Sequence, residues 1–191
     1  MQLDSARRMF RYLNKYFMVP AFRLGLGAFI VNPLTGYIMV MKTIGHKTGK
    51  VRYSPMDYAI QNGNVYCIAG WGQTTHWYRN LLATPRVELL MPGGTLTGIA
   101  EQVTDPDERL SALRQILKNG GLAGSFFGFN PYLTSDHTLA ERCATIPVVR
   151  IRPASVRSGP ADPGGWLWLL WVGAAVLPAV MRWFGKKRRC C

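Results

Sequence analysis

The chain has 191 residues, of which 48% are hydrophobic and 17% charged, and its formal net charge is +13. An ordinary apolar content and only four cysteines exclude the collagen-like, disordered and disulfide-scaffold classes. Nearly all of the charge lies in three basic stretches at 7–15, 42–52 and 182–189, so we expect no nucleic-acid partner, which would favour one continuous basic face.

An amphipathic helix is expected over residues 3–18. Met9, Phe10, Leu13 and Phe17 recur at helical spacing, and basic side chains occupy the opposite side. Such a helix can lie on an anionic membrane or pack as a plain N-terminal helix, and the sequence leaves both open. No uninterrupted apolar stretch typical of a secretory signal precedes or overlaps it, so we expect the main domain to be cytoplasmic.

A mainly β (α+β) domain is expected over residues 37–153, as a small β-barrel of about six strands with intercalated helices. Short apolar runs separated by turn residues, such as those at 62–64 and 92–94, predict the strands. An N-cap residue, a proline and an acid at 105–108 predict a helix start. Strands are expected at 37–41, 51–60, 65–69, 86–90, 95–103 and 146–151, and helices at 75–82, 105–117 and around Leu139. Thr74 or Thr75 can serve as the N-cap of the first of these helices.

The composition changes after Pro153. Residues 1–36 are expected to form the N-terminal helix and a lead-in, 154–165 a linker rich in Pro, Gly and Ser, and 166–191 an apolar membrane segment with a basic tail. The segment has no charge from 166 to 181, and tryptophans lie near its ends as in an interfacial belt. A membrane is therefore an expected partner, with spanning or interfacial placement left open.

The two terminal cysteines, Cys190 and Cys191, follow the basic tail. They could accept a lipid chain, or the tail could be unmodified. Both alternatives stay open.

Several common catalytic patterns are missing from the sequence. The stretch at 45–50 is one residue short of a phosphate-binding P-loop and lacks its serine or threonine. Residues 25–30 fail the dinucleotide fingerprint at its last glycine. His46, His76 and His137 lack paired ligand spacing, so we expect no metal site.

A basic turn followed by an aromatic loop is the remaining candidate for a binding site. Side chains and backbone amides of the turn at 45–50 can cradle an anion, and the loop at 71–78 offers flat surfaces for a ring. Together they predict a ligand with a planar ring and an acidic tail. The alternative is a solvated turn beside core aromatics. The residues concerned are Lys47, Thr48, Lys50, Arg52, Trp71, Trp77 and Tyr78.

The order of these motifs resembles the deazaflavin-dependent nitroreductase family of split β-barrel oxidoreductases. Residues 43–55 correspond to that family's pattern of a strand and then Gly-x-Lys-Ser/Thr-Gly-x-x-Arg-x-x-Pro. Residues 76–81 resemble its Trp-Tyr-x-Asn-Leu helix, 83–85 its Ala-Asn-Pro, and 145–149 its closing strand. The resemblance covers residues 37–152.

The resemblance implies coenzyme F420, a deazaflavin with an anionic phospholactyl-polyglutamate tail, as the cofactor; FMN and haem rank below it. It implies hydride transfer between reduced F420 and a quinone-like or nitro-type acceptor. By position, His46, Lys47 and Thr48 would meet the phosphate end, with Arg52 beside them. The deazaflavin would be lined by Tyr53, Ser54, Pro55, Met56, Asp57, Ile68, Ala69, Gly70, Trp71, His76, Trp77, Tyr78, Arg79 and Asn80.

The chain departs from the family on the substrate side. Nitroreducing relatives have a tyrosine two residues after the motif proline, where this chain has Asp57 followed by Tyr58, and a serine where it has Gly70. We expect Tyr58 and Tyr132 on the substrate side and assign no catalytic residue. A lipid-soluble quinone would explain a membrane-bound enzyme. The alternative is a non-catalytic, membrane-tethered module that binds flavin, haem or deazaflavin; a homodimer is left open.

Overall fold

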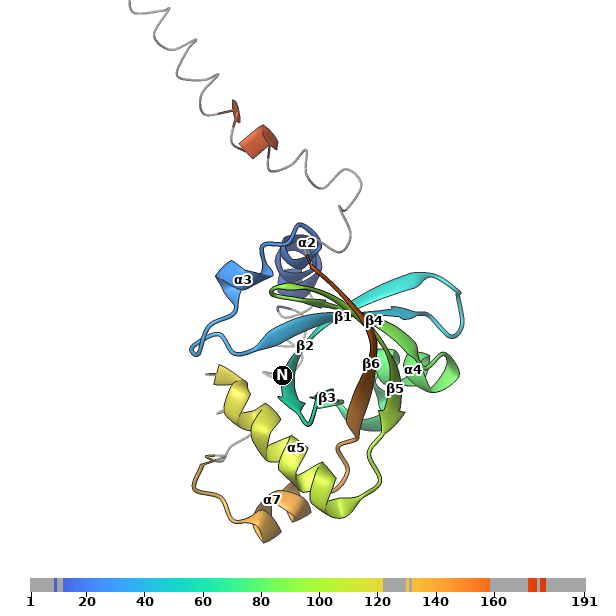
Figure 1. The fold of residues 1–191 in the computed structure, drawn as a ribbon, viewed down its shortest axis with the longest axis vertical. Coiled ribbons are helices and arrows are strands. Elements are labelled where there is room, and N and C mark those ends of the chain that lie inside the picture. The colour runs from blue at the N-terminus through green and yellow to red at the C-terminus, as the bar shows by residue number, and fades with distance from the viewer. Residues whose placement is uncertain are drawn as a thin grey trace, which may run out of the picture.

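The computed structural model describes residues 9, 12–121, 130, 132–158, 172–174 and 176–177. Six antiparallel strands close into a barrel in the order β1-β2-β3-β6-β5-β4, with β4 pairing back onto β1 (Figure 1). The expected β-barrel of about six strands with intercalated helices is confirmed. The strands are β1 (Ile38–Ile44), β2 (Val51–Gln61), β3 (Asn64–Ile68), β4 (Arg86–Met91), β5 (Gly94–Gln102) and β6 (Val148–Ser158).

The barrel interior is filled by alternate residues of its strands. Met39 and Met41 of β1 point inward and face Met56 and Ser54 of β2 across the ladder. Leu89 of β4 joins them in the same cluster. Because successive side chains of a strand point to opposite faces, this register leaves every second residue of β2 on the outer surface of the barrel.

Strand β6 is longer than expected. It runs to Ser158 instead of ending at 151, so residues 154–158 of the predicted linker are strand, and 155–158 pair with β5. Pro153 lies at a register shift between Thr97 and Gly98, where a proline is tolerated. A Cβ at Gly98 would come within 2.5 Å of the Arg152 carbonyl oxygen, so this bulge depends on glycine.

Helices cover three sides of the barrel (Figure 1). Helix α5 packs against β2 and β3, and its predicted N-cap is confirmed because the Asp105 carboxylate accepts the Glu108 N–H at 2.8 Å. Helix α4 lies at the end of the barrel where the β1–β2 hairpin projects (Figure 1). The helices are η1 (Asn14–Met18, a π-helix), α2 (Val19–Arg23), α3 (Gly27–Ile30), η2 (Gly72–Thr74), α4 (His76–Ala83), α5 (Pro106–Asn119) and α7 (Asp136–Arg142).

The N-terminal helix packs through a different face from the one its apolar residues predict. Met9, Leu13 and Phe17 are exposed, while Met18 and Phe22 are buried against the barrel. The π-helical turn at η1 shifts the helical register, which a 3.6-residue pattern does not anticipate. Residues 1–8, 10 and 11 lie outside the described residues.

The expected membrane segment at 166–191 also lies outside the described residues, apart from 172–174 and 176–177. In the part of the chain that the structure describes, no helix is both long and apolar enough to cross a bilayer.

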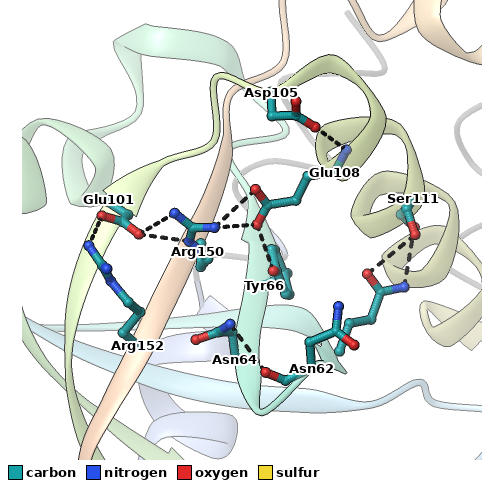
Figure 2. A network of polar contacts seen from close by, with 10 residues as sticks. Asn62, Asn64, Tyr66, Glu101, Asp105, Glu108, Ser111, Arg150 and Arg152 are labelled. Atoms are coloured by element: carbon teal, nitrogen blue, oxygen red, sulfur yellow. Dashed lines mark hydrogen bonds and ion pairs between the residues drawn. The ribbon is translucent and has the colours of Figure 1, made fainter.

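A charged network joins β3, β5, β6 and α5 (Figure 2). Arg150 of β6 donates to Glu101 of β5 at 2.7 Å and to Glu108 of α5 at 2.7 Å, and the Tyr66 hydroxyl of β3 donates to Glu108 at 2.7 Å. Burial raises the pKa of Glu101, but the hydrogen bonds and charges of Arg150 and Arg152 outweigh it, and the pKa is lowered. The network therefore stabilises the fold in the ionised state of this carboxyl.

Arg150→Met is expected to lower the free energy of unfolding by about 1–3 kcal/mol at neutral pH, because two half-buried carboxylates, Glu101 and Glu108, each lose one of their donors. Urea unfolding measures it, with Arg157→Met, an exposed position of the same strand, as the control. A folded-state pKa below the ordinary value gives stability that is lost as the pH falls through it. The difference from wild type should thus shrink in acid; equal stability at pH 7 would contradict the account.

Candidate functional site

A cleft of 730 Å³ opens along the first half of β2, between the N-terminal helix and the start of α4. The residues that line it include no acid, and they include the cations Lys15 and Arg52 and the aromatic side chains of Trp71 and Trp77. The cleft is lined by Asn14, Lys15, Val19, Val51, Arg52, Tyr53, Ser54, Pro55, Trp71, Thr74, Thr75, His76 and Trp77.

The turn between β1 and β2 is held in shape by its own backbone. The Gly45 N–H donates to the Lys50 carbonyl at 2.9 Å, and the Thr48 N–H donates to the Gly45 carbonyl at 3.1 Å. Gly49 has a positive φ of 64°, which glycine adopts without strain. The side chains of Lys47 and Lys50 are exposed, so the turn presents positive charge next to Arg52.

One buried amide fastens this turn to α4. The Asn80 side chain is 4% exposed, and its Oδ1 accepts the His46 backbone N–H at 3.0 Å and lies 2.8 Å from His46 Nδ1. Its Nδ2 donates to Thr43 Oγ1 at 3.1 Å. Because an amide oxygen only accepts, His46 Nδ1 carries the proton and Nε2 is left for another partner.

The first turn of α4 faces the same cleft. Thr75 occupies the N-cap position as predicted, but its hydroxyl donates to the Gly72 carbonyl at 2.7 Å, and no side chain caps the helix. Uncapped N–H groups and the positive end of the helix dipole favour an anion here.

The structure gathers about half of the expected site residues around the cleft. Arg52, Tyr53, Ser54, Pro55, Trp71, His76 and Trp77 line it, and His46, Lys47 and Thr48 form the adjoining turn. The others lie elsewhere: Met56, Tyr58, Ala69 and Tyr78 in the barrel core, Ile68 against the cluster under α5, Asn80 buried behind the turn, and Gly70 and Arg79 exposed.

The two tyrosines expected on the substrate side lie in different environments. Tyr58 is 8% exposed within the barrel core, and both burial and the neighbouring Tyr37 raise the pKa of its hydroxyl. Tyr132 is exposed, with the Lys118 ammonium 5.4 Å from its ring centroid. The ligand roles of all these residues stay predictions.

Six lining residues were missed by sequence reasoning: Asn14, Lys15, Val19, Val51, Thr74 and Thr75. Two kinds of signal could have found some of them: Lys15 belongs to the N-terminal basic stretch, and Thr74 and Thr75 precede a predicted helix, where an anion is favoured. Nothing in the sequence placed Asn14 and Val19 beside β2, because that contact is made across the fold.

Asp57 lies on the outer face of β2, two residues beyond Pro55. Among the residues that the structure describes, its carboxyl makes no hydrogen bond or ion pair. Burial raises its pKa from 3.8 to about 7. A carboxyl in this state is available both as an acid and as a base near neutral pH.

Other reactive groups contribute little to the site. Within the described ranges, no three His, Cys, Asp or Glu side chains are placed to hold a metal ion. Cys67 and Cys143 are buried free thiols, and burial raises the pKa of both, which makes them poor nucleophiles.

Comparison with known proteins gives a family match. The model of a family described as F420H(2)-dependent quinone reductase matches residues 19–121, which contain the turn, the cleft-lining part of β2 and α4.

Solved structures resemble this chain more weakly. One described as a 5-nitroimidazole antibiotic resistance protein from Bacteroides thetaiotaomicron is 14% identical, with a TM-score of 0.48 over 63% of this chain and 75% of that one. A conserved hypothetical protein from Mycobacterium tuberculosis is 18% identical, with a TM-score of 0.49 over 68% and 79%. A structure described as an F420 reductase is 20% identical, with a TM-score of 0.43 over 65% and 91%.

Asn80→Ala should loosen the turn, because His46 loses its acceptor and the buried Thr43 hydroxyl loses its donor. We expect faster amide hydrogen exchange at His46 and a loss of about 1–3 kcal/mol in stability. Leu82→Ala, an exposed position on the same helix, is the control. Unchanged protection of the His46 amide in the Asn80 variant would show that the clamp is not needed.

Proposed function

The chain belongs to the F420H(2)-dependent quinone reductase family, and we propose that its cleft beside β2 holds coenzyme F420 for hydride transfer to a quinone-like acceptor. Membership of this family makes the protein an F420-dependent oxidoreductase with F420 as its coenzyme. The place of the coenzyme, the acceptor and the membrane are our proposals. The observation that carries the place of the coenzyme is the pairing of a basic turn with an aromatic cleft whose lining includes no acid.

The shape and charge of the cleft fit a planar ring with an anionic tail. Lys47, Lys50 and Arg52 concentrate positive charge at the turn, and the first turn of α4 adds uncapped N–H groups. Charge-assisted hydrogen bonds from such groups suit a phosphate and the carboxylates beyond it. Trp71 and Trp77 supply flat apolar surfaces in the same cleft.

The protein's own groups would bind the coenzyme, orient its ring and shield the ring from water. Arg52 and the turn hold the tail, while Tyr53 and Pro55 provide the wall of β2 against which the ring lies. The tryptophans exclude water from the reacting face, which protects a hydride from side reactions. When bound, the coenzyme supplies the hydride, and the geometry of the cleft supplies orientation.

A quinone-like acceptor is the class that fits the description of the family. A nitro-type acceptor remains the second possibility within the same hydride chemistry. Family membership supports the enzyme over the non-catalytic binding module.

Membrane association would bring the enzyme to a lipid-soluble quinone. The apolar segment expected at 166–191 is one support. A second is the exposure of apolar side chains near the N-terminus: Leu13 and Phe17 are exposed on the helical segment that carries Lys15, and Phe29 is exposed on α3. A basic surface with exposed aromatic side chains is typical of interfacial binding to anionic lipids. In this arrangement the catalytic domain lies on the cytoplasmic side.

Lys47→Ala combined with Arg52→Ala should weaken F420 binding at least tenfold, since each removes a charge-assisted contact of about 1.5–3 kcal/mol. Titration of tryptophan fluorescence measures binding, because Trp71 and Trp77 lie in the cleft. Arg86→Ala removes a charge at a separate cleft and should leave the affinity unchanged. Equal affinity of the double variant and wild type would place the tail elsewhere.

Phe17→Glu combined with Phe29→Glu should reduce binding of the full chain to anionic phosphatidylglycerol vesicles about tenfold or more, because two apolar side chains would leave the lipid. Co-sedimentation measures this binding. Leu133→Glu alters an apolar side chain that is 84% exposed on another part of the surface and serves as the control. If the double variant binds as wild type does, the N-terminal face does not contact lipid.

A further inference from the structure

The N-terminal helical segment forms one wall of the cleft. Asn14 and Lys15 of η1 and Val19 of α2 line it, and η1 contacts β2. From the sequence, this segment is expected to lie on a membrane or to pack as a plain helix, and neither role includes contact with a ligand. The amide and the ammonium on this wall therefore have no assigned function.

Buried side chains next to the cleft hold this segment against the barrel. Met18 and Phe22 are buried and pack with side chains of β1 and β4. The Arg23 guanidinium lies 5.0 Å from the centroid of the Tyr53 ring, and Tyr53 lines the cleft. Lys15 is three residues before Met18, so the same packing keeps its backbone close to β2. The ammonium thus belongs to a wall that is in place before a ligand binds.

Two cations of the cleft have no acidic partner in the part of the chain that the structure describes. The lining contains Lys15 and Arg52 and neither Asp nor Glu. Neither cation forms an ion pair with a described carboxylate, and Lys15 Nζ lies 4.9 Å from the ring centroid of its neighbour Tyr16. A cleft lined by charges of one sign concentrates ligands of the opposite sign. This cleft therefore suits a ligand with more than one negative charge.

The charged and the flat parts of the lining differ in exposure. Lys15 and Arg52 are exposed, whereas Tyr53, Pro55 and Trp77 are half-buried. An ammonium is a compact and strongly hydrated charge, so at an open position it suits a hydrated carboxylate better than a neutral ring. The half-buried side chains suit the ring. The tail of the ligand is therefore the part expected beside Lys15.

We propose that Lys15 is a coenzyme-binding residue whose ammonium binds a glutamate carboxylate of the F420 tail, beyond the phosphate held at the turn. This assignment rests on the proposed function, because it takes the cleft as the coenzyme site. It gives the N-terminal segment a role in binding the tail. It also makes the protein select the glutamate-bearing coenzyme over shorter forms that carry the same ring.

The test is a titration of the full chain with F420, followed by the fluorescence of Trp71 and Trp77 in the cleft. Lys15→Gln removes the charge, so the dissociation constant should rise about threefold to fivefold at low ionic strength, as for an exposed ion pair. The difference should vanish in about 1 M salt, where the screening length is about 3 Å. Lys15→Arg keeps the charge and should bind as wild type does. So should the control Lys118→Gln, the same change outside the cleft lining.

Two shorter ligands test which group Lys15 contacts. The coenzyme without its glutamates keeps the phosphate, and the deazaflavin with its ribityl chain alone has neither. Wild type and Lys15→Gln should bind each shorter ligand equally tightly, because the carboxylate that pairs with Lys15 is missing from both. If Lys15→Gln loses as much affinity for the glutamate-free coenzyme as for F420, Lys15 contacts the phosphate. If it loses as much for the ribityl form, Lys15 contacts the ring, and either result overturns the proposal.

The outcomes separate this assignment from the proposed function. If Lys47→Ala combined with Arg52→Ala weakens F420 binding while Lys15→Gln binds as wild type does, the role of Lys15 is overturned and the proposed function stands. If wild type does not bind F420, the proposed function fails first. The melting temperature of ligand-free Lys15→Gln should equal that of wild type, because the side chain is exposed. A lower melting temperature together with weaker binding of all three ligands would contradict a direct contact with the tail.

Discussion

The buried amide of Asn80 is the contact on which the candidate site depends. It joins three elements that are distant in the chain, the end of β1 through Thr43, the basic turn through His46, and α4 itself. Both ends of the amide are used and the side chain is buried, so the turn has little freedom to move relative to the helix. A flexible lysine-rich turn would lose most of its binding energy in ordering; this one is ordered in advance.

The two faces of β2 have different roles, one in the packing of the barrel and the other at the cleft. Inward-pointing Met56 and Tyr58 belong to the barrel core, whereas outward-pointing Tyr53 and Pro55 line the cleft. A slip of one residue in the β1–β2 register would exchange these sets, so the packing of the barrel also determines which groups reach a ligand. The pairing of β4 with β1 closes the barrel, and Arg150 joins β6 to β5 and α5. Both help to fix the β1–β2 register.

Local chemistry was readable from the sequence, and contacts made across the fold were not. Strand alternation, the turn at Asn62 and the Asp105 cap led to nearly the observed elements, and the motif spacing led to the turn and to Trp71 and Trp77. The predicted linker at 154–165 began too early, because a bulge accommodates Pro153 and β6 continues to Ser158. The missed cleft residues Asn14 and Val19 reach β2 only through tertiary packing.

The central claim is that F420 binds in the cleft beside β2 with its tail at the turn clamped by Asn80. A crystal structure of the full chain grown with F420 tests it most directly. We predict density for the deazaflavin ring against Tyr53, Pro55 and Trp77, with the phosphate within hydrogen-bond distance of the turn at 46–48. Coenzyme density at another place, such as the 420 Å³ cleft beside Lys42 and Glu88, would contradict the account.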